Sequence, residues 1–423
     1  MKQTDDHHVA ALDRLADQLR VVMRLGEMLL SAGASAFRVK DGMDRIAHAV
    51  GIDKISIQVT YTEITATAFA GGTFRTELVE QRVMGINAER IDDLNDFVHN
   101  LPGKMLVEDA DDMLDAFANK DPLYSMPISA LASGVACAGF AFLNQGGWVE
   151  CLVVFFAALA GQATRKTLLR RHMNHFAVWM ACGFVATSLY MGIVSVFHIA
   201  DIVDASHQSG VVSSVLFLVP GFPLVTSILD LIRQDYIAGI ARGVYVVMLL
   251  ISTAASVWAV TGLLNWNVNP SADGYHLNTW LLLLGRILAS FVAAYGFAML
   301  FNAPQRASFI AAVIGTVINV LRLTAQDAGL GRMSAIGLAA FLAGLLAALG
   351  AKWTKYSRVT LSVPAVVVMI PGVPLYRALS ALNDGLQVNA AIPEIVTLCL
   401  AITAIGVGLA LSRMVTDRNW LMS

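Results

Sequence analysis

Charged side chains are scarce in this sequence, and their distribution along the chain is uneven. Only 14% of the 423 residues are Asp, Glu, Lys or Arg, while 57% are hydrophobic. A soluble protein carries about 25% charged residues. Residues 1–125 contain 13 Lys/Arg and 21 Asp/Glu, a net charge of −8, whereas residues 126–423 contain 16 and 10, a net charge of +6. This shift predicts a polar amino-terminal domain (1–125) followed by a membrane domain.

Several chemical signatures are also missing. The four cysteines lie in apolar segments without disulfide-like or ligand-like spacing, so we expect small buried or lipid-facing thiols and no metal site. The first residues, MKQTDDHHVAALDRLADQ, lack the apolar stretch of a signal peptide. Ser31, Ser35, His48 and His99 are residue types found in hydrolases, but no G-x-S-x-G sequence accompanies them. We predict no catalytic residue, no cofactor and no nucleic-acid partner.

Long apolar runs dominate the membrane domain. A transmembrane helix needs roughly 17–25 mainly apolar residues. Ten segments qualify, and they predict an α-helical membrane protein that crosses the lipid bilayer several times. The segments are 127–144, 147–164, 176–198, 209–232, 236–264, 278–301, 304–322, 333–351, 359–382 and 390–412.

The basic residues near the ends of these segments predict the orientation, because cytoplasmic loops carry an excess of Lys and Arg. If residues 1–125 are cytoplasmic, twelve such residues fall on the cytoplasmic side. Only Arg322, Arg332 and Arg377 fall on the opposite side. The bias places both termini in the cytoplasm.

Two Pro-Gly-x-Pro sequences interrupt the apolar runs, PGFP at 220–223 and PGVP at 371–374, and 371 exceeds 220 by 151. A proline in a helix interior costs about 3 kcal/mol, so each sequence is expected to break its helix. The same offset relates the first predicted span to the sixth, which divides the ten spans into two sets of five, 126–270 and 271–423. Because five is an odd number, the second set enters from the opposite face. The sequence therefore predicts inverted repeats, each with a broken fourth helix.

The two breaks predict a substrate site, because discontinuous helices of inverted repeats meet near the midplane of secondary transporters. The prolines deprive preceding carbonyls of their usual donors, and the half-helix beyond each break presents amides suited to an anion. Free carbonyls and free amides together suit a zwitterion such as an amino acid. The simpler alternative is that each motif only kinks a packed helix. The predicted substrate-binding residues are Pro220, Gly221, Phe222, Pro223, Pro371, Gly372, Val373, Pro374 and Arg286.

Three of the charged residues inside the predicted spans are candidates for function, because charge at the bilayer centre costs at least about 2.5 kcal/mol. Arg286 is expected to bind a carboxylate or act as a gate, or else to form a structural ion pair or extend toward the membrane interface. Asp230, seven residues after Pro223, and Glu394, just after Pro393, are candidate proton carriers. The alternative for Asp230 is a cytoplasmic position beside Arg233.

The amino-terminal domain is expected to be a small α+β unit. Apolar positions from Leu12 to Leu29 mark one face of a helix that Gly33 ends, and Ser35 is placed to cap a second helix. KISIQVTYT alternates as a strand, and Gly71-Gly72 separates two further strands as a hairpin turn. Helices at about 87–100 and 108–120 follow.

The stretch MLLSAGASAFRVKDGMDRIAHAVGI, the strands after it, and the segments PGFPLVTSILDLI and PGVPLYRAL resemble the threonine/serine exporter family in its single-chain form. The resemblance covers roughly residues 15–412. It implies export of L-threonine and L-serine through the bacterial inner membrane, driven by the proton motive force, with a hydrolase-like amino-terminal domain. Related two-chain systems are associated with dicarboxylate export. The most specific parts are the S-x-G-A-x-x-x-R pattern (Ser31, Gly33, Ala34, Arg38) and the first break with Asp230.

The sequence as a whole favours a secondary active exporter of small neutral amino acids, with the substrate, protons and the lipid bilayer as partners. One alternative is an exporter of a dicarboxylate such as succinate, and another is a membrane-anchored hydrolase acting through residues 1–125. A third is a sensor or scaffold that the spans merely anchor. The oligomeric state, including a homo-oligomer, is left open.

Overall fold

The computed structural model describes residues 2–82, 84–201, 210–263, 277–370, 372–383, 387–417 and 420. The chain forms two compact units. The first consists of Met1–Pro122 and Thr226–Gly243, and the second of Leu123–Val225 and Val244–Ser423. A short stretch from the middle of the chain is thus part of the amino-terminal unit. The finer division into 1–125, 126–270 and 271–423 stays a prediction.

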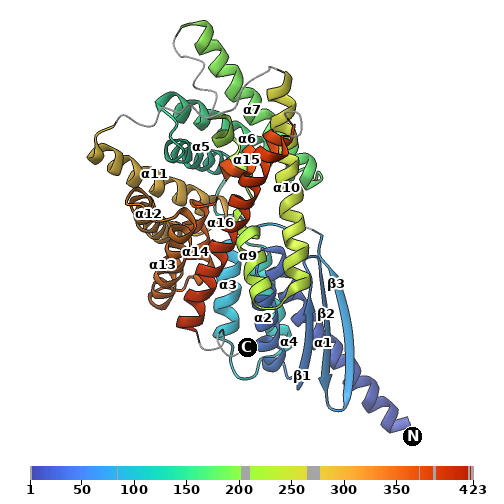
Figure 1. Ribbon diagram of the computed structural model, residues 1–423. Coiled ribbons are helices and arrows are strands. Elements are labelled where there is room, and N and C mark those ends of the chain that lie inside the picture. The colour runs from blue at the N-terminus through green and yellow to red at the C-terminus, as the bar shows by residue number, and fades with distance from the viewer. Residues whose placement is uncertain are drawn as a thin grey trace. The chain divides into compact units, whose positions relative to one another are not determined.

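The amino-terminal unit combines helices with one antiparallel sheet of order β1-β2-β3 (Figure 1). The predicted hairpin is confirmed: Ala70 pairs with Thr73, and Gly71 and Gly72 adopt φ values of +56° and +80°, which glycine tolerates best. The elements are α1 (Lys2–Ser31), α2 (Ala36–Ala49), β1 (Lys54–Val59), β2 (Glu63–Ala70), β3 (Thr73–Glu80), α3 (Ala88–His99) and α4 (Val107–Ala118).

The core of this unit follows from helix and strand periodicity. The predicted apolar face of α1 is buried at Leu15, Leu19 and Leu29, and β2 buries every second residue from Ile64 to Ala68. Gly33 adopts a φ of +91° directly after α1, where the amide of Ala34 donates to the Leu29 carbonyl at 3.0 Å. The predicted helix stop is therefore confirmed.

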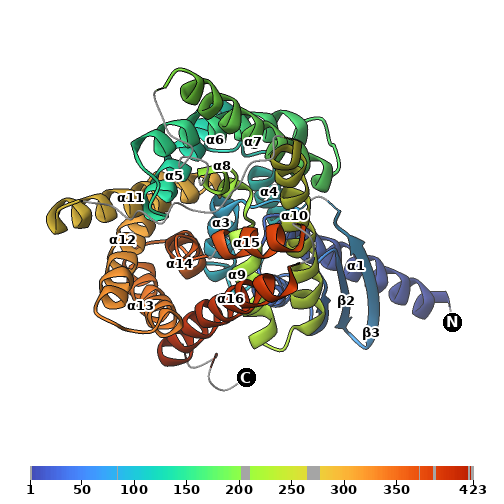
Figure 2. The same ribbon diagram turned by 45° about the horizontal axis from the view of Figure 1, so that its top comes forward.

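The second unit is a bundle of helices. Figure 2 shows α14 inside an arc formed by α11, α12, α13 and α16. The elements that lie in this unit or run into it are α5 (Met126–Leu143), α6 (Trp148–Leu169), α7 (His175–Ile199), α8 (Val211–Ser214), the 3₁₀ turn η2 (Leu216–Leu218), α9 (Gly221–Ile232), α10 (Tyr236–Leu263), α11 (Thr279–Leu300), α12 (Gln305–Asp327), α13 (Arg332–Trp353), α14 (Arg358–Val367), α15 (Gly372–Asn383) and α16 (Val388–Thr416).

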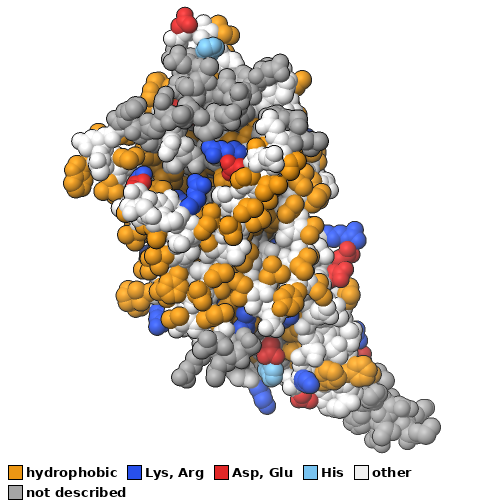
Figure 3. Space-filling view, viewed as in Figure 1, with side chains coloured by type: hydrophobic (Ala, Val, Ile, Leu, Met, Phe, Trp, Pro, Cys, Tyr) orange, Lys and Arg blue, Asp and Glu red, His pale blue; other side chains and the backbone are white. Residues whose placement is uncertain are grey.

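Eight of the described helices are long and apolar enough to cross a membrane: α5, α6, α7, α10, α11, α12, α13 and α16. Hydrophobic side chains cover much of the surface over these helices (Figure 3). Trp148, Trp280 and Trp353 lie at helix ends and are at least 73% exposed, as expected of aromatic residues at a membrane–water boundary. The chain is a polytopic membrane protein.

The remaining two predicted spans, 209–232 and 359–382, are each divided into shorter helices. In the first, α8 and η2 end before Pro220, and α9 begins at Gly221. In the second, α14 ends at Val367 and α15 begins at Gly372. The helix therefore breaks at both Pro-Gly-x-Pro motifs, as the prolines predict. The total of ten spans stays a prediction.

Candidate functional site

Equivalent backbone hydrogen bonds precede the two breaks. Before the first, the amides of Val219 and Gly221 donate to the carbonyls of Leu216 and Val219 at 3.1 and 2.8 Å. Before the second, the equivalent bonds measure 3.0 Å from the amide of Ile370 to the Val367 carbonyl and 2.9 Å from the amide of Gly372 to the Ile370 carbonyl. The expectation that these carbonyls lack donors is therefore wrong. Short turns replace the helical bonds, because buried backbone groups need partners.

The breaks also pack against each other. A Cβ atom added to Gly221 would lie 2.8 Å from Cγ2 of Val367 and 3.0 Å from Cδ1 of Ile370. A Cβ atom added to Gly372 would lie 2.4 Å from Cδ2 of Leu216 and 4.0 Å from Cγ2 of Val219.

These contacts are reciprocal, because adding 151 to 216, 219 and 221 gives 367, 370 and 372. Each glycine receives the apolar side chains that occupy the matching positions of the other segment. No larger residue fits in either place without a shift of its neighbours.

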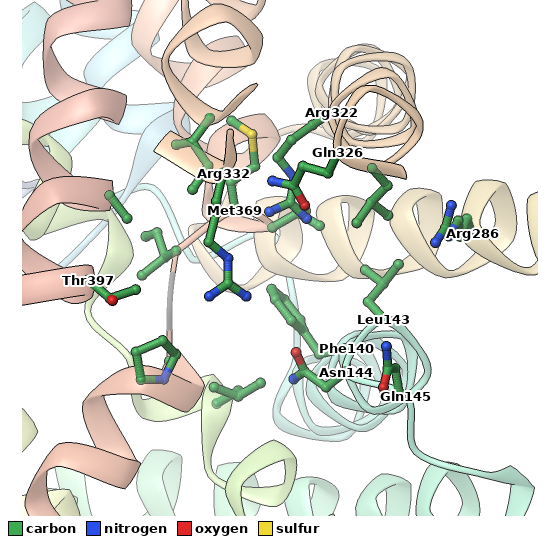
Figure 4. A pocket seen from close by; sticks show the side chains of 18 of the residues that line it. Phe140, Leu143, Asn144, Gln145, Arg286, Arg322, Gln326, Arg332, Met369 and Thr397 are labelled. Atoms are coloured by element: carbon green, nitrogen blue, oxygen red, sulfur yellow. The ribbon is translucent and has the colours of Figure 1, made fainter. Parts of the chain in front are cut away.

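A cavity of about 260 Å³ lies beside the second break. Figure 4 shows Arg322, Gln326 and Arg332 projecting into it, with Phe140 of α5 and Asn144, which follows α5, facing them. Its remaining lining residues are Leu143, Gln145, Leu216, Arg286, Leu323, Asp327, Ile336, Val368, Met369, Ile370, Gly372, Pro374, Thr397 and Ala401.

The cavity has an excess of positive charge, three arginines against Asp327. Arg286 pairs with Asp327, with a second contact of 3.4 Å from Nη2 to Oδ1. Arg322 is held in place, because its Nε donates to Asn319 Oδ1 at 3.0 Å and Asn319 in turn donates to Ser290 Oγ at 2.8 Å. No carboxylate in the described part of the chain pairs with Arg322 or Arg332. Such a cavity suits a ligand that carries a carboxylate.

Of the residues predicted to bind substrate, Gly372, Pro374 and Arg286 line the cavity. Phe222 is buried and contacts Phe301 edge-on, with ring centroids 5.5 Å apart. The other predicted positions at the first break, Pro220, Gly221 and Pro223, do not line the cavity. Pro371 lies outside the described residues, as does the side chain of Val373.

Arg322, Gln326 and Arg332 are cavity residues that the sequence interpretation missed. The sequence analysis used Arg322 and Arg332 only as basic residues near span ends, to predict the orientation. Both belong to the three basic residues on the side that the charge bias leaves almost without them. Their position on that side could have marked them as candidates, because a basic residue on the non-cytoplasmic side does not contribute to the orientation of the spans.

Asp230, a predicted proton carrier, lies in the amino-terminal unit together with the S-x-G-A-x-x-x-R pattern. Its Oδ1 accepts from the amide of Ala36 at 2.9 Å, and its Oδ2 lies 3.5 Å from Nε of Arg242. Arg242 donates to the carbonyls of Gly33 and Ala34 at 3.1 and 2.9 Å. Both charged side chains are fully buried. The loop that ends α1 and the helix pair α9–α10 are thus joined by one buried ion pair.

The cap of α2 differs from the expectation. Ser35 occupies the N-cap position but makes no side-chain cap hydrogen bond, and the carboxylate of Asp230 accepts from the first helical amide instead. A carboxylate at a helix start is favoured by the unpaired amides there.

The remaining predicted residues have local partners. Arg38 contacts Asn95 Oδ1 at 3.4 Å, and burial lowers the pKa of its guanidinium. Ser31 Oγ donates to the Met28 carbonyl at 3.1 Å. Glu394, the second candidate proton carrier, lies 3.6 Å from Arg377.

The comparisons with known proteins agree with the motifs. Residues 20–264 match the family model described as "Putative threonine/serine exporter", and residues 286–415 match "Threonine/Serine exporter, ThrE". The first match alone covers more than half of the chain. The chain belongs to the threonine/serine exporter family.

Relatives of this exporter-family chain include two proteins that match most of it and one that is named as a transporter subunit. The "Threonine/serine exporter" of Corynebacterium glutamicum is 24% identical over 392 residues, 90% of this chain and 78% of that protein. The "Probable threonine/serine exporter" of Mycobacterium tuberculosis is 21% identical over 412 residues, which cover 94% of this chain and 76% of that protein. The "Probable succinate transporter subunit YjjP" of Escherichia coli is 27% identical over 261 residues, which cover 58% of this chain and 98% of that protein. No solved structure matches the chain.

The buried ion pair generates a stability prediction. Replacing Arg242 with Ala leaves Asp230 buried without its cation, and removing one member of a buried pair costs about 3–5 kcal/mol. We expect the amides of α2 to exchange their hydrogens markedly faster, measured by hydrogen exchange on the full chain in detergent.

The matched control is Arg45→Ala, because Arg45 makes an exposed pair with Asp41 at 3.0 Å on the same helix. That change is expected to cost no more than about 1 kcal/mol. Equal effects of the two substitutions would contradict a stabilising role for the buried pair.

Proposed function

We propose that this protein is a secondary active exporter that moves small neutral amino acids, L-threonine and L-serine, out of the cytoplasm through the bacterial inner membrane. The observation that carries the proposal is the arginine-lined cavity beside two broken helices that pack on each other. Discontinuous helices at membrane depth bind the substrate in several families of secondary transporters. The family and the two relatives that match most of the chain supply the substrate class.

The proposed site binds an amino acid at both ends. Arg322 and Arg332 take the carboxylate, because a guanidinium offers paired donors that match it. Gln326 supports them, since its buried Nε2 has no hydrogen-bond partner among the described residues. The ammonium group is directed toward Asp327, the carboxylate that lines the cavity. In this proposal the two arginines, rather than the residues of the first break, make the main contacts with the substrate. Gly372, Pro374 and Arg286 remain proposed substrate residues.

Inverted repeats are part of the proposal. The reciprocal contacts at Gly221 and Gly372 support them, because a two-fold relation between the halves exchanges the partners of each contact. Five membrane-crossing segments in each half then place the two halves in opposite orientations. Both termini are proposed to be cytoplasmic.

Proton coupling is proposed to use Asp230 and Glu394. Each has an arginine partner, Arg242 and Arg377. A proton that binds the carboxylate releases such a partner, so protonation converts directly into a structural change. The driving force of export is then the proton gradient across the membrane.

A dicarboxylate such as succinate is the second candidate substrate. The net positive charge of the cavity, with three arginines and one aspartate, favours a doubly negative ligand over a zwitterion. The relative named as a succinate transporter subunit points the same way.

Counterflow in proteoliposomes decides between the candidates. We expect liposomes preloaded with threonine to accumulate labelled threonine and serine, and an imposed proton gradient to change the rate. Uptake of labelled succinate alone, in liposomes preloaded with succinate, would make a dicarboxylate the substrate in place of the amino acids. Exchange of none of the three would contradict the proposed function.

The arginine site has its own test. Arg322→Gln is expected to lower transport at least about tenfold, because loss of a charge-assisted hydrogen bond to a carboxylate costs about 1.5–3 kcal/mol. Arg306→Gln is the control, since Arg306 is exposed at the other end of the same helix. Wild-type transport by Arg322→Gln would exclude the cavity as the carboxylate site.

The contact between the breaks is tested by Gly221→Leu and Gly372→Leu. Added side chains would overlap Val367 and Leu216, so both variants are expected to reach the membrane but to lose transport. Gly192→Leu serves as the control, because a Cβ atom at Gly192 in α7 meets nothing within 4 Å. Undiminished flux in both break variants would count against a site at the breaks.

A further inference from the structure

A second internal match relates the first three helices of each half. Residues 133–143, SGVACAGFAFL, and residues 290–300, SFVAAYGFAML, are identical at seven of eleven positions, with an offset of 157. The contacts are again reciprocal. A Cβ atom on Gly139 would lie 2.8 Å from the Ala289 carbonyl oxygen, and one on Gly296 would lie 2.6 Å from that of Ala132. Adding 157 to 132 and 139 gives 289 and 296.

The loops follow the same offset. Gln145 and Asn302 have positive φ values of +68° and +57° after α5 and α11. His172 and Gly329 have positive φ values of +54° and +95° after α6 and α12. Each residue of α5–α7 therefore has an equivalent in α11–α13, 157 positions on, while the breaks keep the offset of 151.

The equivalents of the cavity residues form a second cluster. Arg322 corresponds to Arg165 and Arg332 to His175, so the first position keeps its arginine and the second keeps a side chain that can donate a hydrogen bond. Ile336, which lines the cavity, corresponds to Trp179. Met369 corresponds to Leu218 at the offset of 151.

Trp179 fills the space at this second cluster. Its indole is 5% exposed, and its Nε1 donates to the Leu218 carbonyl at 2.8 Å. The guanidinium carbon of Arg165 lies 4.3 Å from the centre of the indole ring. The His175 ring stacks on the same indole at 6.1 Å and an angle of 29°. In the other half, the equivalent side chain, Ile336, is smaller than Trp179 and cannot donate a hydrogen bond. The space beside it remains open as the cavity.

A second aromatic side chain adds to the filling. A Cβ atom on Gly161 would lie 2.4 Å from Cζ of Phe217, so the ring packs directly on α6. The equivalent of Phe217 is Val368, which lines the open cavity. One half is thus closed by aromatic side chains where the other is open.

The charge of Arg165 has no anionic partner in the part of the chain that the structure describes. A cation packed against nonpolar side chains without a counter-ion is costly, and the face of an indole compensates it only in part. A carboxylate is the ligand that would complete its environment, as it would for Arg322.

We propose that Arg165 and His175 form a second carboxylate site, which Trp179 closes in the present state. This inference rests on the proposed exporter function. The charge bias assigns the cluster to the cytoplasmic side and the open cavity to the opposite side. Departure of Trp179 from Leu218 admits the substrate from the cytoplasm to Arg165. Closure over Arg165 accompanies opening at Arg322, where the substrate leaves.

Labelling of a native thiol tests the closure without any substrate. Cys182 is buried in α7, one helical turn from Trp179. With Cys137, Cys151 and Cys399 replaced by Ser, a charged methanethiosulfonate reagent is applied to inside-out vesicles. We expect Trp179→Ile to raise the labelling rate of Cys182 about tenfold, because the open state becomes more populated.

Trp179→Phe keeps the ring packing but loses the hydrogen bond to Leu218, so an intermediate rate is expected. Trp148→Ile is the control, because Trp148 is 73% exposed at the start of α6. An unchanged rate in both Trp179 variants would overturn the proposal, as would labelling only in right-side-out vesicles.

The KM values measured from the two faces test Arg165 as a substrate residue. With the substrate identified by counterflow, Arg165→Gln is expected to raise the KM measured from the cytoplasmic face about tenfold, and Arg322→Gln the KM measured from the opposite face. Equal effects on both faces would overturn the second site. If neither threonine, serine nor succinate is transported, the proposed function fails, while the labelling result still reports whether Trp179 closes a path.

Discussion

The contact between the two interrupted segments is the constraint on which the membrane unit depends. Each proline removes a backbone donor, and each freed carbonyl near the bilayer core needs a partner. Short turns at Leu216–Val219 and Val367–Ile370 supply these bonds, but they leave a bent, irregular chain that must be covered by protein. Each break is covered by the other, because Gly221 and Gly372 let the opposite side chains approach closely. The arginine cavity lies at the edge of this contact.

The amino-terminal unit shares a helix with this arrangement. Helix α9 starts at the first break, and its residues from Thr226 onward belong to the amino-terminal unit. There Asp230 accepts from the start of α2, and Arg242 holds the loop after α1. Within the amino-terminal unit, the end of α9 is therefore joined to the start of α2 and to the loop after α1 by the buried pair of Asp230 and Arg242.

Features set by local chemistry were predictable from the sequence. The prolines at 220 and 371 predicted the helix breaks, Gly33 the end of α1 and Gly71-Gly72 the hairpin, because each depends on the conformational limits of one or two residues. The partner of Arg286, the cap of α2 and the convergence of Arg322 with Arg332 were not predicted. These depend on packing between segments far apart in the chain. The repeat at 133–143 and 290–300 was readable, but only after the helices had been aligned at an offset of 157 rather than 151.

Disulfide formation between the breaks tests the central claim most directly. In a background without native cysteines, Leu216→Cys with Gly372→Cys, and Val367→Cys with Gly221→Cys, are each oxidised in the membrane and analysed by mass spectrometry of the digested protein. The reciprocal packing predicts that both pairs form a disulfide with similar yield, while the mismatched pair Leu216→Cys with Val388→Cys does not. Cross-linking of only one reciprocal pair, or of neither, would contradict the account.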